Sequence, residues 1–385
     1  MVQLTIPDFL KEFLENSKEQ LDIVGELPPD VTKTVINQVM ASAKNATQIS
    51  SNIIALRERI RKTLAKHRLL NKYESGSIID PANLVAIDGT YRVIPTTMYD
   101  IIFVGAVSYS FRKEGFGYEL HALITPPSML SEKIARGLMI YLEFKLASEV
   151  LSRYDFVILD GSIIAHLTNL SELTATRLQN YDDPIWDSND LLRLLKSLSK
   201  RKIVSGVLKS SKILASPKKQ TGKMFIRKYL RDLNLVATDA AVLSIVLEPE
   251  EWVKLSWVGK DFLLASKLYN TDITPSDSTT IEEYLNNVGI DIVYFKPREW
   301  SRSYKVEYPG RLKNSKLQKV LDIIYYQVNN PLIEELELQF LAHKMCSQLA
   351  KVALILFTST KNVLQQRFAR KWMNMIFTAT RYRTD

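Results

Sequence analysis

Phe156-Val157-Ile158-Leu159-Asp160-Gly161-Ser162 is predicted to form a short buried strand that ends in a carboxylate, a glycine and a hydroxyl. Four apolar residues in a row are typical of a central strand in an α/β sheet. A long helix is predicted just before it, from Ser131, because apolar residues recur at every fourth position. A carboxylate at the carboxyl end of a buried strand, beside a glycine that lets a ligand approach, is a suitable place for a metal ion.

The same phrase occurs earlier in the chain, where Leu84-Val85-Ala86-Ile87 runs into Asp88-Gly89-Thr90. Asp-Gly is also a common turn dipeptide, so either copy alone could be only a turn. Two copies, each directly after four apolar residues, favour two strand ends. If the two strands are neighbours, Asp88 and Asp160 can supply two ligands to one metal site.

The composition is that of an ordinary globular protein, with 385 residues of which 46% are hydrophobic and 24% are charged. The single cysteine, Cys346, excludes an internal disulfide and a cysteine-based zinc site. The N-terminal sequence has no basic and apolar regions of a signal peptide, and the apolar run 352–357 is too short to span a bilayer. We therefore expect a cytoplasmic protein that contacts no membrane.

The net charge of +9 is concentrated in one part of the sequence. Residues 191–231 hold thirteen Lys and Arg and no Asp or Glu, although the whole chain has 42 acidic residues. A basic run is most often only a solvated face, but this length without one acid favours a polyanionic partner. Nucleic acid is favoured over a membrane surface because no amphipathic anchor accompanies the run.

Three strands are predicted in succession before the helix that starts at Ser131. This order argues against a doubly wound fold, in which strands and helices alternate. The predicted strands lie at 83–88, 101–110, 117–124, 156–159, 203–208, 254–258, 291–295 and 304–308. The predicted helices after the one from Ser131 lie at 188–200, 224–232, 315–328, 333–357 and 362–380.

We expect three parts in the chain: a helical N-terminal arm at 1–78, a mixed α/β core at 79–345 and a helical C-terminal extension at 346–385. Residues 1–30 carry seven acids and two bases, whereas basic residues dominate from Arg57 to Lys72. The arm could simply pack on the core, or it could dock a partner or a second copy with its basic end near nucleic acid. We expect the two roles to be combined.

Glu143, on the predicted helix from Ser131, is the candidate for a third metal ligand. Metal-dependent cleavage of a phosphodiester needs several carboxylates that hold two divalent cations about 3.5–4 Å apart. Glu143 flanks the apolar stripe of the helix, so it is expected to be half-buried and to need a partner. Glu149 is the rival on the same helix, and the alternative for Glu143 is an ordinary acid on a helix surface.

Lys209 directly follows the predicted strand 203–208 and could meet the scissile phosphate, although it could equally be a surface lysine of the basic run. Between 294 and 308, aromatic residues interleave with Lys and Arg, which suits single-stranded nucleic acid because bases stack on rings while cations follow phosphates. The alternative is that these rings face a core. The four histidines show no metal-ligand spacing. The candidate DNA-binding residues are Lys212, Lys218, Lys219, Lys223, Trp300, Arg302 and Tyr304.

The chain resembles the NurA nuclease family in a series of phrases that occur in the family's order over roughly residues 83 to 340. Each phrase alone is weak evidence for the family, whereas the order in which they occur is fairly specific. The order of acids, on a first strand, a helix and a fourth strand, resembles that of ribonuclease H-like nucleases. The phrases are Ala86-Ile87-Asp88-Gly89-Thr90, Leu142-Glu143, Val157-Ile158-Leu159-Asp160-Gly161-Ser162, Gly206-Val207-Leu208-Lys209-Ser210-Ser211, Thr238-Asp239, Leu247-Glu248-Pro249 and Tyr304-Lys305-Val306-Glu307-Tyr308-Pro309.

The resemblance implies a ribonuclease H-like mixed sheet with helical additions at both ends. It implies that Asp88, Glu143 and Asp160 bind two manganese or magnesium ions, with Asp239 as a fourth ligand. It further implies 5′–3′ cleavage of DNA, single-stranded at least, in end resection and double-strand-break repair. The implied assembly is a homodimer that works with a hexameric HerA-type ATPase.

Two alternatives stay open at this point. The chain could be a non-catalytic DNA-binding or translocase-docking subunit, although intact carboxylates at all four positions argue against this. It could also be a Holliday-junction or Argonaute-type nuclease on the same fold. The family carries a late histidine after a Tyr-Pro turn, whereas this chain has Asn330-Pro331, so either His343 or Glu337 could take that place.

Overall fold

The structure of the chain is a computed structural model. It describes residues 29–74, 76, 79–95, 99–112, 115–126, 130–150, 153–163, 165–166, 169–170, 213–216, 226, 229–230, 233, 237–257, 289–309, 312 and 314–367. The predicted helix at 188–200, the predicted strand at 203–208 and most of the basic run 191–231 lie outside these residues.

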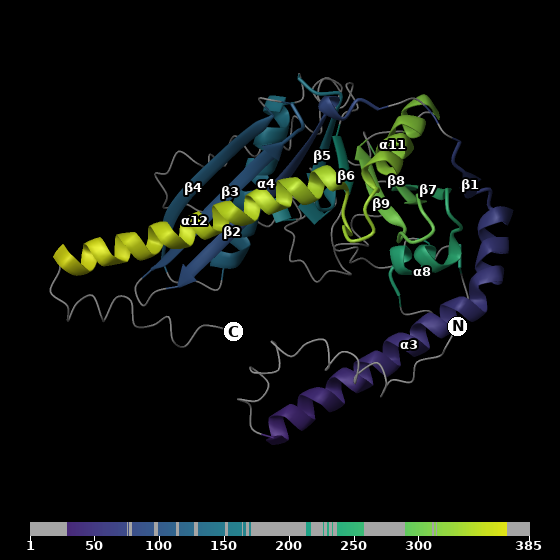
Figure 1. Ribbon diagram of the computed structural model, residues 1–385, viewed down its shortest axis with the longest axis horizontal. Coiled ribbons are helices and arrows are strands. Elements are labelled where there is room, and N and C mark those ends of the chain that lie inside the picture. Colours follow the sequence, from purple (N-terminus) through teal and green to yellow (C-terminus); the bar gives the residue numbers. More distant parts are fainter. Residues whose placement is uncertain are drawn as a thin grey trace, which may run out of the picture.

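The described strands form one nine-stranded mixed sheet with helices on both faces (Figure 1). The strands are β1 (Leu70–Lys72), β2 (Leu84–Pro95), β3 (Asp100–Tyr109), β4 (Phe116–Thr125), β5 (Phe156–Asp160), β6 (Ile213–Ser216), β7 (Glu251–Trp257), β8 (Ile290–Lys296) and β9 (Tyr304–Pro309). The helices are α3 (Pro29–Lys66), α4 (Ser131–Val150), α8 (Asp239–Val246), α11 (Asn314–Gln327) and α12 (Glu337–Arg367), with a 3-10 turn at Pro81–Asn83.

The strand order across the sheet is β1-β7-β8-β9-β6-β5-β2-β3-β4. The pairs β2–β5 and β5–β6 are parallel, and all the other neighbouring pairs are antiparallel. Three strands in succession, β2, β3 and β4, precede α4, as the sequence predicted. On the side of β5 away from β2 the neighbour is β6, Ile213–Ser216, whereas the predicted strand at 203–208 lies outside the described residues.

The register between β2 and β5 decides where the two Asp-Gly phrases meet. Ala86 pairs with Ile158 and Ile87 pairs with Leu159 in parallel. Asp88 and Asp160 follow at the next position of each strand and therefore lie at the same level of the sheet. The prediction that the two strands are neighbours is confirmed.

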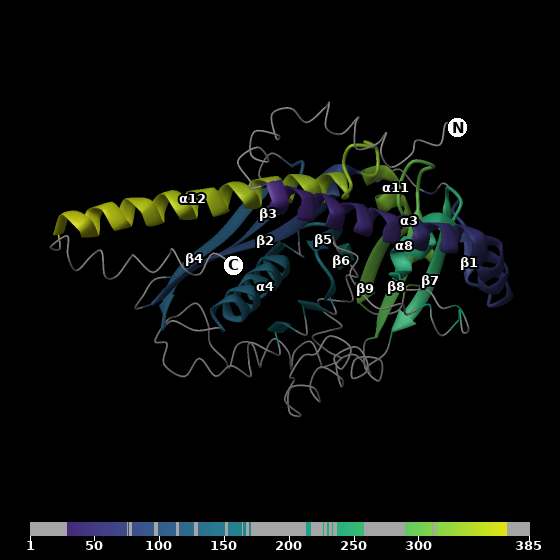
Figure 2. The ribbon, with the colours of Figure 1, turned by 90° about the horizontal axis from the view of Figure 1, so that it is seen from below.

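Two buried clusters cover the two faces of the sheet. Figure 2 shows α12 on one side of the strands and α4 on the other. One cluster joins α4, α8 and the C-terminal half of α3 to the face that presents Val85 and Ile87. The other joins α11 and α12 to the face that presents Leu84 and Ala86. Because successive side chains of a strand point to opposite faces, Asp88 faces α12 and Gly89 faces α4.

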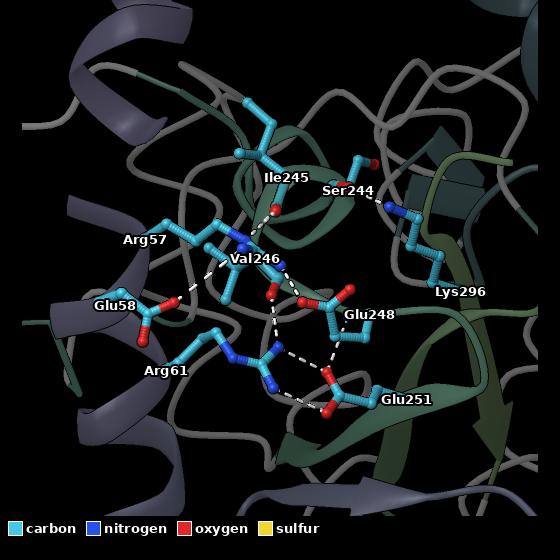
Figure 3. Close-up of polar contacts among 9 residues, drawn as sticks. All are labelled: Arg57, Glu58, Arg61, Ser244, Ile245, Val246, Glu248, Glu251 and Lys296. Atoms are coloured by element: carbon cyan, nitrogen blue, oxygen red, sulfur yellow. Dashed lines mark hydrogen bonds and ion pairs between the residues drawn. The ribbon is translucent and has the colours of Figure 1, made fainter. Parts of the chain in front are cut away.

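The C-terminal half of α3 is attached to the core by apolar packing and by ion pairs (Figure 3). Arg61 donates to both oxygens of Glu251, at 2.6 and 2.8 Å, and to the carbonyl of Val246 at 2.7 Å. Arg57 donates to the carbonyl of Ile245 at 3.0 Å and pairs with Glu248. These two basic residues therefore bind acids and carbonyls of the core, whereas Arg59, Lys62, Lys66 and Arg68 are exposed. The expected place of this basic end near nucleic acid stays a prediction.

Helix α12 is continuous across 358–361, where the sequence pattern predicted a break between two helices. The Thr358 hydroxyl donates to the carbonyl of Leu354, four residues earlier, so this polar residue is accommodated within the helix. Among the described residues, only the stretch Glu337–Ser359 is long and apolar enough to cross a membrane by length and composition. That is weak support for a membrane span, because core helices of other proteins pass the same test.

Neither of the predicted domain boundaries, at 78 and at 345, separates the described structure into independent parts. Strand β1, within the predicted arm, pairs with β7 at the edge of the sheet. Helix α12 runs through the boundary at 345 without interruption. The arm and the extension are therefore continuous with the core in the described residues.

Candidate metal centre

Asp88, Asp160 and His343 form a cluster that could hold a metal ion. Each offers one ligand atom, and these atoms all lie within 4.8 Å of one another. Asp88 is buried, and the other two are half-buried. His343 Nδ1 lies 2.8 Å from Asp88 Oδ2. Two carboxylates and one imidazole are a donor set that fits manganese or magnesium, since oxygen ligands suit both ions and imidazole suits transition metals.

Helix α12 brings His343 to the two strand ends. Leu338 and Ala342 are buried against the sheet, and this packing turns Gln339 and His343 toward the strand ends. Gln339, one turn before His343, donates from Nε2 to Asp160 Oδ1. On the next turn, Cys346 donates from Sγ to the carbonyl oxygen of Asp88 at 3.2 Å. Two residues of α12, Gln339 and His343, thus contact the carboxylates of Asp160 and Asp88, and Cys346 bonds the backbone of Asp88.

Glu143 reaches the same strand ends from the opposite face, on α4. Its side chain is buried, with 1% of its surface exposed. Its Oε1 occupies the space beside Gly89, where an added Cβ would lie only 2.2 Å away. Glu149, the rival on the same helix, is exposed near the helix end. Burial raises the pKa of the Glu143 carboxyl, and the charge of Asp160 acts in the same direction.

His166 lies between Glu143 and the end of β5. Its Nε2 is 3.0 Å from Glu143 Oε2 and 3.0 Å from the carbonyl oxygen of Asp160. Burial alone would lower the pKa of His166, but the charge of Glu143 and the hydrogen bonds to Glu143 and Asp160 raise it. The sequence pattern pointed to no role for this histidine.

The turn after Asp160 is held by a buried pair of charges on β9. The Ser162 hydroxyl lies 2.8 and 2.9 Å from the two carboxylate oxygens of Glu307. Lys305 Nζ lies 2.6 Å from Glu307 Oε1, and Glu307 has no exposed surface. Gly161 has a φ of +112°, a conformation that favours glycine.

Asp239 lies apart from the cluster. It is the first residue of α8 and is buried, with Oδ1 accepting from the backbone N–H of Ile226 at 3.1 Å. Its Oδ2 accepts from the Tyr294 hydroxyl at 3.3 Å. In the part of the chain that the structure describes, the metal-binding group does not include Asp239. In this structure Asp239 links α8 to β8, and its role as a fourth ligand, which the resemblance implied, stays a prediction.

The aromatic residues of 294–308 divide between core and surface. Tyr294, Tyr304 and Tyr308 are buried, so the alternative of rings that face a core holds for them, and Tyr304 cannot stack on a base. Trp300 is exposed. Arg302 donates to the carbonyl of Glu334 at 2.6 Å, which occupies part of its guanidinium.

The basic candidates of the run 191–231 lie outside the described residues. They are Lys209, Lys212, Lys218, Lys219 and Lys223. Their proposed contacts with phosphate therefore stay predictions.

The positions of the two aspartates were predictable from the residue pattern, whereas the contacts that His343 and His166 make with the acids were not. No spacing along the sequence marks His343 as a ligand, and only the resemblance offered it, with Glu337, for the place of the family's late histidine. His343 meets the aspartates through tertiary packing. A signal was present in the helical pattern, since Gln339 and His343 stand one turn apart beside the apolar pair Leu338 and Ala342.

The fold is thus a mixed α/β sheet in which two carboxylates at adjacent strand ends and an imidazole of α12 form a donor set that could hold a divalent cation. The NurA domain model matches residues 82–355, and the chain belongs to the NurA family. No curated protein sequence matches the chain.

Several solved structures are similar to this chain. The crystal structure of the NurA nuclease from Sulfolobus solfataricus is 16% identical, with a TM-score of 0.57 over 89% of this chain and 99% of that one. This likeness shows the fold. A crystal structure of NurA with manganese is 16% identical, with a TM-score of 0.48 over 82% of this chain and 96% of that one.

Proposed function

We propose that this chain is a metal-dependent DNA nuclease. The observation that carries the proposal is the convergence of Asp88, Asp160 and His343, whose ligand atoms lie within 4.8 Å of one another in a chain of the NurA family. Asp88, Asp160 and His343 would hold the cation, and Glu143 would approach from the side of α4. When bound, divalent cations supply an activated water and stabilise the leaving oxygen of the phosphodiester.

The residues around the cluster would prepare it for this task. Gln339 and Cys346 orient the two aspartates from α12, and the buried pair Glu307 and Lys305 holds the turn after Asp160. Preorganised ligands lose little freedom when a cation binds, so binding is stronger and the geometry is reproducible. We propose manganese or magnesium, and two ions.

We further propose a ribonuclease H-like core. The support is the order of acids along the fold: Asp88 on the first strand of the core, Glu143 on the helix after the third strand and Asp160 on the fourth strand. The division into an arm at 1–78, a core at 79–345 and an extension at 346–385 is kept as part of this proposal.

The proposed biological setting follows from family membership. It is 5′–3′ DNA end resection in double-strand-break repair, in the cytoplasm, as a homodimer with a hexameric HerA-type ATPase. The basic run 191–231 and the exposed Trp300 would bind single-stranded DNA.

The test is digestion of end-labelled single- and double-stranded DNA by the purified chain with manganese, with magnesium or with a chelator. We expect cleavage with a cation and none with the chelator. If the chain binds DNA but cleaves neither substrate with any cation, the alternative of a non-catalytic DNA-binding or translocase-docking subunit holds instead.

A further inference from the structure

His166 is a buried histidine that the proposed metal cluster does not use as a ligand. It follows Asp160 by six residues, and 6% of its surface is exposed. Its Nε2 has two oxygen neighbours at 3.0 Å, namely Glu143 Oε2 and the carbonyl oxygen of Asp160. A carbonyl and a carboxylate are both acceptors, so Nε2 must carry the hydrogen.

The ring of His166 is held in place from several sides. Phe144, the residue after Glu143, meets it edge to face with ring centroids 5.9 Å apart. The backbone N–H of His166 donates to the carbonyl of Ser162 at 2.8 Å. A Cβ added at Gly161 would lie 2.5 Å from Cε1 of the ring, so the glycine also provides room for the imidazole.

In the part of the chain that the structure describes, few other groups lie where they could fix the Glu143 carboxylate. Its Oε1 lies against Gly89, whose backbone N–H also bonds the carboxylate. A carboxylate that is 1% exposed cannot rely on bulk water, and a buried charge needs nearby donors. The Nε2–H of His166 donates to the carbonyl oxygen of Asp160, and Glu143 Oε2 lies 3.0 Å from the same Nε2 as an ion-pair neighbour. Among the described residues, Oε2 accepts no hydrogen bond, so the imidazole is the polar group that links this oxygen to the end of β5.

We propose that His166 is a positioning residue, which holds the Glu143 carboxylate in register with Asp160 so that α4 and β5 present their acids to the same cation. This inference rests on the proposed function of the metal centre. It extends the site by one residue that touches neither metal nor substrate and acts through Glu143. Such supporting residues typically change metal affinity or activity about 10–100-fold when they are replaced.

The experiment compares His166→Gln with His166→Asn. The amide nitrogen of Gln is as many bonds from Cβ as Nε2 of His, so it can donate in the same place, whereas the amide of Asn is one bond too short. We expect H166N to lose about 10–100-fold in manganese affinity, measured by electron paramagnetic resonance of free manganese, and H166Q to bind about tenfold more tightly than H166N.

The matched control is His121→Asn on β4, two strands from β2. It removes a similar contact, from His121 Nε2 to Glu119 Oε2 at 3.1 Å, away from the cluster. We expect wild-type manganese affinity from this control. If H166N binds manganese as tightly as the wild type, or if H166Q is no better than H166N while both keep the wild-type melting temperature, the positioning role is refuted.

A second measurement does not depend on whether His166 variants fold. The chain has four histidines, so selective ¹⁵N-histidine labelling gives a simple spectrum of ring nitrogens. Without metal, we expect one ring N–H that is protected from solvent exchange and that shifts in Glu143→Gln. A spectrum with no protected ring N–H, or one that is unchanged in E143Q, would overturn the inference. Failure of the proposed function is distinct, because it would appear as a wild-type protein that cleaves no DNA.

Discussion

At the scale of single residues, the two Asp-Gly phrases place glycines where no side chain would fit. A Cβ at Gly89 would lie 2.2 Å from Glu143 Oε1 and 2.6 Å from Met139 Cγ. At Gly161, two features disfavour a side chain: the φ of +112° and the imidazole of His166, which an added Cβ would meet. Each glycine therefore lets an acid or a histidine from another element reach the end of its strand.

Glu143 and Glu149 provide a matched pair for testing which acid of α4 serves the cluster. Glu143 is buried beside Gly89, whereas Glu149 is exposed near the end of the same helix. We expect E143Q to lower manganese-dependent cleavage about 100-fold and E149Q to leave it near wild type. Initial rates at saturating manganese measure both. Loss of cleavage in E149Q with full activity in E143Q would reverse the assignment.

The residue scale also shows what could be predicted from sequence. Asp88 and Asp160 were found because four apolar residues before each acid mark a buried strand end. His343 was offered only by the resemblance, with Glu337 as its rival, and His166 was not found at all, because their distances to the acids depend on how α12 packs and on how the chain turns after β5. Asp239 was assigned to the cluster by resemblance alone, and in this structure its carboxylate accepts from the Ile226 backbone N–H and the Tyr294 hydroxyl.

At the scale of elements, strand positions were predicted well and helix ends less well. The strands around 83–88, 101–110, 117–124 and 291–295 were predicted within a few residues at their starts, since β-branched and apolar runs are bounded by turns. The continuity of α12 was missed because Thr and Ser at 358–360 favour a break locally, whereas a helix can absorb them by bonding to the preceding turn. The edge strand β1 is three residues long, too short for a pattern.

The attachment of α3 to the core gives a prediction about stability and pH. We expect R61Q to lower the free energy of unfolding by about 1–3 kcal/mol, because it leaves the carboxylate of Glu251 without its main donor. Arg59, exposed on the same helix, is the matched control, and R59Q should stay within about 0.5 kcal/mol of the wild type. Chemical denaturation at pH 7 measures both.

The effect of Arg61 should fade in acid. Burial alone would raise the pKa of Glu251, but the hydrogen bonds from Arg61 outweigh it and lower that pKa below its usual 4.5. A depressed folded-state pKa gives stability that is present above the unfolded value and is lost as the pH falls through the folded value. The difference between wild type and R61Q should therefore shrink below about pH 4.5. A difference that is constant down to pH 3 would contradict this.

At the scale of the whole molecule, the charge is distributed unevenly between the metal cluster and the basic run. The cluster gathers carboxylates at the strand ends, and residues 191–231 carry thirteen positive charges without an acid. Within that run, β6 at 213–216 pairs with β5, and Ser216 lies beside Asp160. We therefore expect a polyanion that binds close to β6 to lie near the cluster.

Replacing Lys218, Lys219 and Lys223 together with Gln tests this arrangement. We expect weaker binding to single-stranded DNA and a salt dependence flattened by up to about one log-log unit for each phosphate that is no longer neutralised. Fluorescence anisotropy across a series of salt concentrations measures the slope. An unchanged slope would place the DNA-binding surface elsewhere on the molecule.

The most direct test of the central claim is calorimetric titration of manganese into the wild type and into D88A. We expect the wild type to bind manganese and D88A to lose about 100-fold or more in affinity, together with DNA cleavage. D88A should be no less stable without metal, because its loss relieves repulsion among clustered carboxylates. D155A, at the opposite end of β5 and exposed, is the control that should bind as the wild type does. Wild-type manganese affinity and cleavage in D88A would contradict the assignment of the metal centre.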